Sequence, residues 1–165
     1  MTGPRNYHPR LLVVSLILAV VLTLVPLPTW MDAFRPYWVA LVMAYWILES
    51  DHLHSLGAAF VIGLSLDFVT GTLLGQHALS LLIWVYLLLV LRPRIRFAPP
   101  GRQAFFMLAL LLNDRVVQLW ILWLAGAGVP GVGYWTSPLV GAALWPWIFL
   151  LLDNLRARRR AHRAS

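Results

Sequence analysis

The sequence predicts an all-α membrane protein whose helices cross a lipid bilayer six times. Three observations support this prediction: the composition, the apolar stretches along the chain and the distribution of arginine. Of the 165 residues, 61% are hydrophobic and only 12% are charged, about half the charged share of a soluble domain. A surface of this composition favours hydrocarbon over water as its surroundings.

Six apolar stretches divide the chain. They are Leu11–Leu27, Pro36–Leu48, Ser55–Leu74, His77–Leu91, Gln103–Ala125 and Ser137–Leu152. A straight helix needs about 20 residues to cross the hydrocarbon. The second and fourth stretches are shorter, so they must recruit flanking residues, thin the bilayer or shelter behind neighbouring helices. We expect a single six-span domain over residues 1–165, with a short basic head (1–10) and tail (153–165).

The arginines predict the orientation of these spans. Eleven of them fall on one side of a six-span arrangement, namely Arg5, Arg10, Arg92, Arg94, Arg96, Arg102, Arg156, Arg158, Arg159, Arg160 and Arg163. The opposite connections hold only Arg35, and Arg115 lies within a stretch. Since positively charged segments stay cytoplasmic, both termini are expected in the cytoplasm. Clustering at span ends also argues against a nucleic-acid partner, despite the net charge of +7.

No sequence motif indicates catalysis, a metal or a cofactor. The chain has no cysteine, which excludes thiolate chemistry. It contains no nucleophile elbow, no HExxH and no phosphate-binding glycine loop ending in lysine. Glu49, Asp51, His52 and His54 crowd one connection, but their spacing matches no metal motif, and we expect an exposed polar turn there. The first stretch lacks a signal cleavage site and is predicted to be a retained span.

Small residues recur at every fourth position in the third stretch. Ala59, Gly63, Asp67, Gly71 and Gly75 form one slowly drifting stripe on a helix. Because small residues at this spacing let another helix approach closely, we expect a packing seam. A small-molecule binding groove is the alternative.

Charged residues interrupt the third and fifth stretches. An ionised aspartate in hydrocarbon costs roughly 2.5 to 3.5 kcal/mol, so Asp67 should face protein or water. The fifth stretch carries Asp114 and Arg115 near its middle. Asp67 and Arg115 each lie twelve residues past the start of their stretch, which is about 18 Å along a helix. Equal depth permits a buried Asp67–Arg115 pair that fixes helix register; a proton or ion relay is the alternative.

Two proline motifs mark the second and sixth stretches. Arg35 and Pro36 begin the second stretch; proline is tolerated in a first helical turn, and the arginine is either an interfacial anchor or a specific contact. Trp145, Pro146 and Trp147 lie within the sixth, where the proline removes a backbone donor and predicts a kink. This second motif is either helix packing or a shaped surface for another protein.

Together these features resemble the MreD family of bacterial rod shape-determining membrane proteins. The matching segments are Phe34-Arg35-Pro36-Tyr37-Trp38-Val39, Tyr45-Trp46-Ile47-Leu48, Gly57, the run Gly63-x-x-x-Asp67-x-x-x-Gly71-x-x-x-Gly75, Asp114, and Gly141-x-x-Leu144-Trp145-Pro146-Trp147-Ile148-Phe149-Leu150-Leu151. The likeness covers nearly the whole chain in length, order and topology. Arg115 is not part of the family pattern.

The resemblance implies a non-enzymatic scaffold in the bacterial inner membrane, without a cofactor, that helps regulate peptidoglycan synthesis and cell shape. Its implied direct partner is MreC, and its implied wider partners are MreB, RodZ and the transpeptidase and glycosyltransferase of the elongation complex, alongside membrane lipids. The candidates for partner binding or intramembrane polar contacts are Arg35, Pro36, Gly63, Asp67, Gly71, Gly75, Asp114, Arg115, Trp145, Pro146 and Trp147.

The family fold is thought similar to the substrate-binding subunits of energy-coupling-factor transporters. This similarity supplies an alternative function, a solute-binding subunit of a membrane transporter, although fold alone does not determine function. Such a subunit needs a cavity lined by several polar side chains. The short, glycine-rich outer loops predict few such groups and therefore favour the scaffold.

Overall fold

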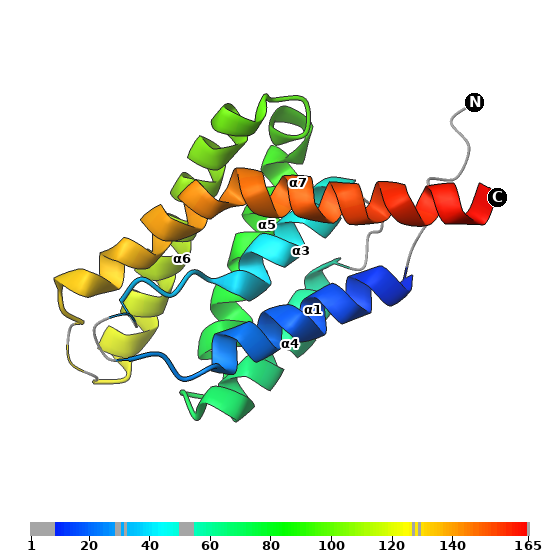
Figure 1. Cartoon of the computed structure of the whole chain (residues 1–165). Coiled ribbons are helices and arrows are strands. Elements are labelled where there is room, and N and C mark those ends of the chain that lie inside the picture. The colour runs from blue at the N-terminus through cyan, green and yellow to red at the C-terminus, as the bar shows by residue number, and fades with distance from the viewer. Residues whose placement is uncertain are drawn as a thin grey trace.

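The computed structural model describes residues 9–28, 31, 33–49, 55–126, 128 and 130–164. Within these ranges the chain forms six α-helices and a short 3-10 helix, with no strand. They are α1 (Pro9–Leu24), α3 (Trp38–Glu49), α4 (Ser55–Thr70), α5 (Gln76–Ile95), α6 (Pro100–Leu124), the 3-10 helix η1 (Val132–Trp135) and α7 (Thr136–Ala164) (Figure 1). The predicted all-α fold with six helices is confirmed.

Helix length separates the six helices into two groups. Gln76–Ile95, Pro100–Leu124 and the segment Val132–Arg158 are long and apolar enough to cross a bilayer, whereas α1, α3 and α4 are apolar but shorter. The predicted fourth stretch reaches 20 residues in α5 because it recruits residues at both ends. The predicted basic tail is not separate from the last helix, since α7 continues to Ala164.

Helix α3 forms the centre of the bundle. It packs against α1, α5 and α7, and Figure 1 shows it between α1 and α7. Every residue from Val39 to Leu48 is buried. A 12-residue helix is about 18 Å long, less than the roughly 30 Å of hydrocarbon. Helix α3 is therefore sheltered by its neighbours, which is one of the three solutions expected for a short span.

Helices α4 and α5 approach each other at the backbone. Gly63 in α4 is buried, and a Cβ built on it would lie 2.4 Å from the Cα of Ala78 in α5. No side chain larger than hydrogen therefore fits at Gly63 without displacing the backbone of Ala78. The predicted packing seam is therefore present at Gly63.

The seam does not extend to Gly71 and Gly75, so that part of the prediction is wrong. Helix α4 ends at Thr70, and nothing lies within 4 Å of a Cβ built on either glycine. Both have positive φ, 66° at Gly71 and 96° at Gly75. The N–H of Thr72 donates to the carbonyl of Asp67, which completes a Schellman turn around Gly71. These glycines shape the turn between α4 and α5 and do not pack helices together.

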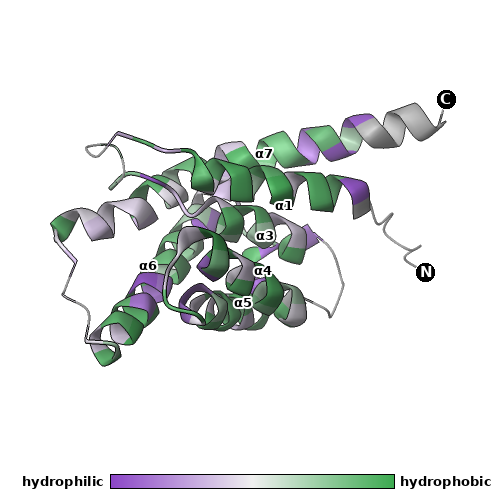
Figure 2. Cartoon of the chain, turned by 90° about the horizontal axis from the view of Figure 1, so that it is seen from below, coloured by the Kyte–Doolittle hydropathy of each residue, from purple (hydrophilic) through white to green (hydrophobic). Residues whose placement is uncertain are grey.

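The outside of the bundle is largely apolar. Val14, Ile17 and Leu18 of α1 and Phe105 of α6 are more than half exposed. Figure 2 shows green ribbon along most helices, with purple residues at the start of α1 and in the second half of α7. An apolar exposed surface with polar ends is the pattern expected of helices surrounded by lipid.

We expect Gly63→Ala to destabilise the protein by about 1–3 kcal/mol, because the added methyl group overlaps the backbone of Ala78. Thermal unfolding in detergent measures this effect. Gly57→Ala is the matched control on the same helix, since nothing lies within 4 Å of a Cβ built there. Equal melting temperatures for the two variants would contradict the close approach of α4 and α5.

Candidate functional site

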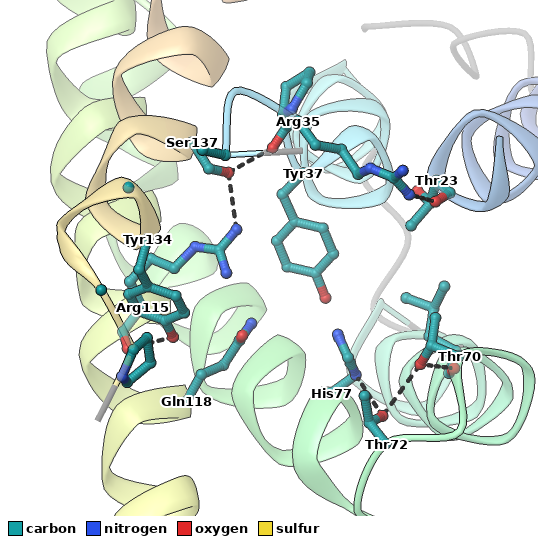
Figure 3. A pocket seen from close by; sticks show the side chains of 16 residues that line it. Thr23, Arg35, Tyr37, Thr70, Thr72, His77, Arg115, Gln118, Tyr134 and Ser137 are labelled. Carbon is teal, nitrogen blue, oxygen red and sulfur yellow. Dashed lines mark hydrogen bonds between the residues drawn. The ribbon is translucent and has the colours of Figure 1, made fainter. Parts of the chain in front are cut away.

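Three connections surround a cavity at one end of the bundle. They join α1 to α3, α4 to α5 and α6 to α7, and we call this end the loop end. The cavity has a volume of about 570 Å³, within the range of small-molecule sites. The polar side chains that define it include Arg35, Tyr37, His77, Arg115, Gln118 and Ser137 (Figure 3).

Asp67 lies at the loop end of α4 and caps the first turn of α5. Its Oδ2 accepts the N–H of Gly75 at 2.8 Å and of Ala78 at 3.3 Å, and its Oδ1 accepts the N–H of His77 at 2.7 Å. The first N–H groups of a helix have no partner within it, and their partial positive charge favours an anion. The buried carboxylate is therefore stabilised by the neighbouring helix.

His77 and Thr72 complete the shell around Asp67. The His77 Nδ1 lies 2.9 Å from Oδ1 of Asp67, and the Thr72 hydroxyl donates to the same oxygen at 3.1 Å. The His77 ring also packs edge-on against Tyr37, with ring centroids 6.3 Å apart. His77 thus joins the capped turn to the cavity that it lines.

Arg115 makes its contacts on the opposite side of the cavity. One terminal nitrogen of its guanidinium donates to the Ser137 hydroxyl at 2.8 Å, and its Cζ lies 4.7 Å from the centre of the Tyr134 ring. In the described part of the chain, no ion pair joins Arg115 to Asp67. The hypothesis of a direct Asp67–Arg115 pair is therefore wrong; the relay alternative stays a hypothesis.

Arg35 makes a specific contact, which was one of its two predicted roles. Its guanidinium donates to the carbonyl of Thr23 and, at 2.8 Å, to that of Val25. These carbonyls lie at the end of α1, where a cation offsets the negative end of the helix dipole. The Ser137 hydroxyl donates to the Arg35 carbonyl at 2.7 Å. A short chain of hydrogen bonds thus connects α6, α7 and the segment before α3. The buried Pro36 belongs to that segment and not to the first turn of the helix, because α3 begins at Trp38.

Two buried oxygens near the cavity lack ordinary partners. Asp114 accepts the Gln118 side-chain amide at Oδ2, 2.8 Å away, while its Oδ1 makes no hydrogen bond in the described part of the chain. The Tyr37 hydroxyl is also buried without a hydrogen bond of ordinary geometry among the described residues, although Ser80 lies nearby. Buried polar atoms are nearly always hydrogen-bonded, so the Tyr37 hydroxyl, which belongs to the cavity lining, is a donor with unused capacity. Asp114 is not among the described lining residues, and Ser80 also interacts with its carboxylate.

The Trp-Pro-Trp motif of α7 divides between the interior and the surface. Trp145 is fully buried and donates from Nε1 to Oε1 of Gln103 at 3.1 Å, whereas Trp147 is 73% exposed. Helix α7 continues through Pro146. One tryptophan therefore packs the bundle, and the other is available to lipid or to a partner.

The Glu49 cluster differs from its prediction. Oε2 of Glu49 accepts a hydrogen bond from the buried Arg156 at 2.8 Å, which joins the end of α3 to α7. Glu49 is therefore not part of a freely exposed turn. Asp51, His52 and His54 lie outside the described residues. Among the residues that are described, no group of three or more His, Asp or Glu could hold a metal ion.

Sequence reasoning missed the cavity and several residues that line it. The prediction of few convergent polar groups considered only the loops, whereas His77, Arg115 and Gln118 belong to helices. A signal was present for His77, which follows Asp67 across a turn bounded by two glycines. Nothing in the local sequence distinguishes Tyr37 or Ser137 from other interfacial residues.

We expect Asp67 to couple energetically with His77 and not with Arg115. A double-mutant cycle of Asp67→Asn and His77→Ala should give an interaction energy of about 0.5–3 kcal/mol, as for residues in contact. The cycle of Asp67→Asn and Arg115→Gln should be additive within about 0.5 kcal/mol. Thermal unfolding of the five variants in one detergent supplies both values. A larger coupling to Arg115 than to His77 would refute the capping arrangement.

The fold and cavity define an α-helical membrane protein with a polar cavity among its helix ends. Residues 5–155 match the family described as rod shape-determining protein MreD. The rod shape-determining protein MreD of Haemophilus influenzae is 31% identical over 153 residues, covering 88% of this chain and 90% of that protein. The chain therefore belongs to the MreD family. No solved structure matches it, so the similarity to energy-coupling-factor subunits stays a prediction.

Proposed function

We propose that this chain is a non-enzymatic membrane scaffold of the rod-shape system that binds MreC directly. The observation that carries the proposal is the family match, which spans residues 5–155. Through MreC the chain would connect to MreB, RodZ and the transpeptidase and glycosyltransferase of wall elongation. In this role it would help regulate peptidoglycan synthesis and cell shape.

The geometry supports a role that depends on lateral contacts. The described residues are mostly helical, and the connections among them are too short to form a domain outside the bilayer. The exposed surface is rich in large apolar side chains, which can contact either lipid or a partner helix. A single-span partner would bind such a surface within the membrane.

We propose that the protein resides in the inner membrane with both termini in the cytoplasm, because eleven arginines fall on one side of the six-span arrangement and positively charged segments stay cytoplasmic. A reporter that fluoresces only in the cytoplasm should be bright when fused to either terminus. A fusion at the connection between α6 and α7 should be dark. A stable protein with one dark terminus would contradict the six-span orientation.

We expect the tagged chain to co-purify MreC from detergent extracts of a cell that expresses both proteins. The matched control is an unrelated six-span protein carrying the same tag at a similar level. Recovery of MreC equal to that of the control would overturn the scaffold proposal.

We further expect Trp147→Ala to weaken MreC binding about tenfold, since exposed tryptophans often contribute 1–2 kcal/mol or more to interfaces. Trp147 is 73% exposed and Trp123 is 71% exposed on a different helix. Trp123→Ala is therefore a control matched in size and exposure. Binding is measured with purified proteins in nanodiscs, and equal affinity for the two variants would assign Trp147 to lipid.

The cavity favours a second candidate function, a solute-binding subunit of a membrane transporter. It provides the convergent polar side chains that such a subunit needs. The two candidates differ in the proteins that the chain would retain on purification. Transporter ATPases in place of MreC would favour the second candidate.

A further inference from the structure

We infer that the loop-end cavity binds an anionic ligand, whose phosphate or carboxylate oxygens are held by the Arg115 guanidinium and the Tyr37 hydroxyl. This inference goes beyond the scaffold proposal, because binding to MreC requires no ligand in the cavity. It rests on the charge of the lining, on a buried hydroxyl without a hydrogen bond of ordinary geometry among the described residues, and on the size of the cavity.

The lining of the cavity is positively charged. Its described residues include Arg35 and Arg115, and none of those described residues is an aspartate or glutamate. Asp67 does not line the cavity, and both of its oxygens accept hydrogen bonds within the α4–α5 turn. Among the described lining residues an anion would therefore meet two cations and no carboxylate, while the buried carboxylate of Asp114 acts on Tyr37 from outside that lining.

Arg115 makes no ion pair with a described carboxylate, whereas an intramembrane arginine ordinarily has such a partner. Its guanidinium donates to the neutral hydroxyl of Ser137 and lies over the ring of Tyr134. Asp114 attracts it electrostatically, but the side-chain partners of that carboxylate are Gln118, which donates to it at 2.8 Å, and Ser80. Within the described ranges no carboxylate lies at ion-pair distance from Arg115. A guanidinium has five N–H donors, so it can hold an additional oxyanion.

The Tyr37 hydroxyl supplies a second, independent indication. Tyr37 is 9% exposed, and its hydroxyl makes no ordinary hydrogen bond in the described part of the chain. In Figure 3 the hydroxyl end of the ring points toward the space between Gln118 and His77. A ligand oxygen in that space would accept the hydroxyl proton and remove the cost of leaving a buried donor unpaired.

The size and chemistry of the cavity fit a small oxyanion-bearing molecule. A volume of about 570 Å³ admits more than a bare ion. The planar fork of a guanidinium matches carboxylate and phosphate oxygens, and low-dielectric surroundings strengthen the attraction. Arg35 adds positive potential while its own donors bind the end of α1. A free metabolite and a lipid headgroup share this chemistry.

The experiment measures the melting temperature of the full chain in phosphatidylcholine nanodiscs during titration with three probes. Inorganic phosphate and acetate represent free oxyanions, and dihexanoyl phosphatidic acid represents a lipid headgroup. Sodium chloride at matched ionic strength is the baseline for salt effects. We expect at least one probe to raise the melting temperature in a saturable way. Saturation by phosphatidic acid alone would indicate a lipid source, and saturation by phosphate or acetate would indicate a free ligand.

Variants localise the effect to the cavity. Arg115→Gln should weaken the apparent affinity about tenfold to a hundredfold, as expected for loss of a charge-assisted hydrogen bond. Tyr37→Phe keeps the ring against His77 and should weaken affinity several-fold. Arg115→Lys retains the charge and should bind better than Arg115→Gln even if both are less stable. Arg94→Gln, at an exposed position outside the cavity lining, should bind like the unmodified chain.

Two results would overturn the inference. One is the absence of a saturable shift with all three probes, and the other is an unchanged affinity in both Arg115→Gln and Tyr37→Phe. Neither result depends on MreC, which is absent from this experiment. A chain that binds MreC without binding any probe would leave the scaffold proposal intact while refuting the anion site.

Discussion

The carboxylate of Asp67 is the interaction on which the loop end of the bundle depends. A charge in the membrane and the unpaired N–H groups of a helix start are each costly. Asp67 offsets both costs, because its two oxygens accept three backbone N–H groups from the start of α5. Ala78, which supplies one of these groups, is also the residue that Gly63 approaches. The cap and the close backbone contact therefore hold the same two helices together at one place.

The position of α5 then determines what surrounds the central helix. Trp84, Val85 and Leu88 of α5 are completely buried, and α5 packs against both α3 and α6. Helix α3 is too short to cross the hydrocarbon unaided, so its apolar residues require neighbours on all sides. Polar contacts hold its two ends. Arg35, just before the helix, donates to the end of α1, and Glu49, the last residue of the helix, binds Arg156 of α7. The bundle thus has an apolar centre and hydrogen-bonded ends.

The sequence predicted the helices well, but it predicted poorly which residues and helices contact one another. The reason is physical. Apolar stretches and proline or glycine positions are local signals, and they indicated all six helices. Depth along a helix is also local, but it does not determine which side a residue faces or which helix lies beside it. Asp67 and Arg115 had matching depth, yet Asp67 bonds to residues of the next turn and Arg115 to α7. The seam failed at Gly71 because α4 ends one residue earlier, which the four-residue spacing alone could not reveal.

The cavity and the apolar exterior make different physical demands on the same chain. An exterior that contacts lipid or a partner helix needs only apolar side chains, and it would function without buried polar atoms. The loop end nevertheless keeps an arginine without an ion-pair partner among the described residues and a buried tyrosine hydroxyl without an ordinary hydrogen bond. Scaffolding alone does not explain such costly groups. A ligand bound between Arg115 of α6 and Tyr37, which immediately precedes α3, would contact both segments at once. Ligand binding would therefore favour one relative arrangement of these helices, so occupancy of the cavity and contacts on the exterior would be thermodynamically linked.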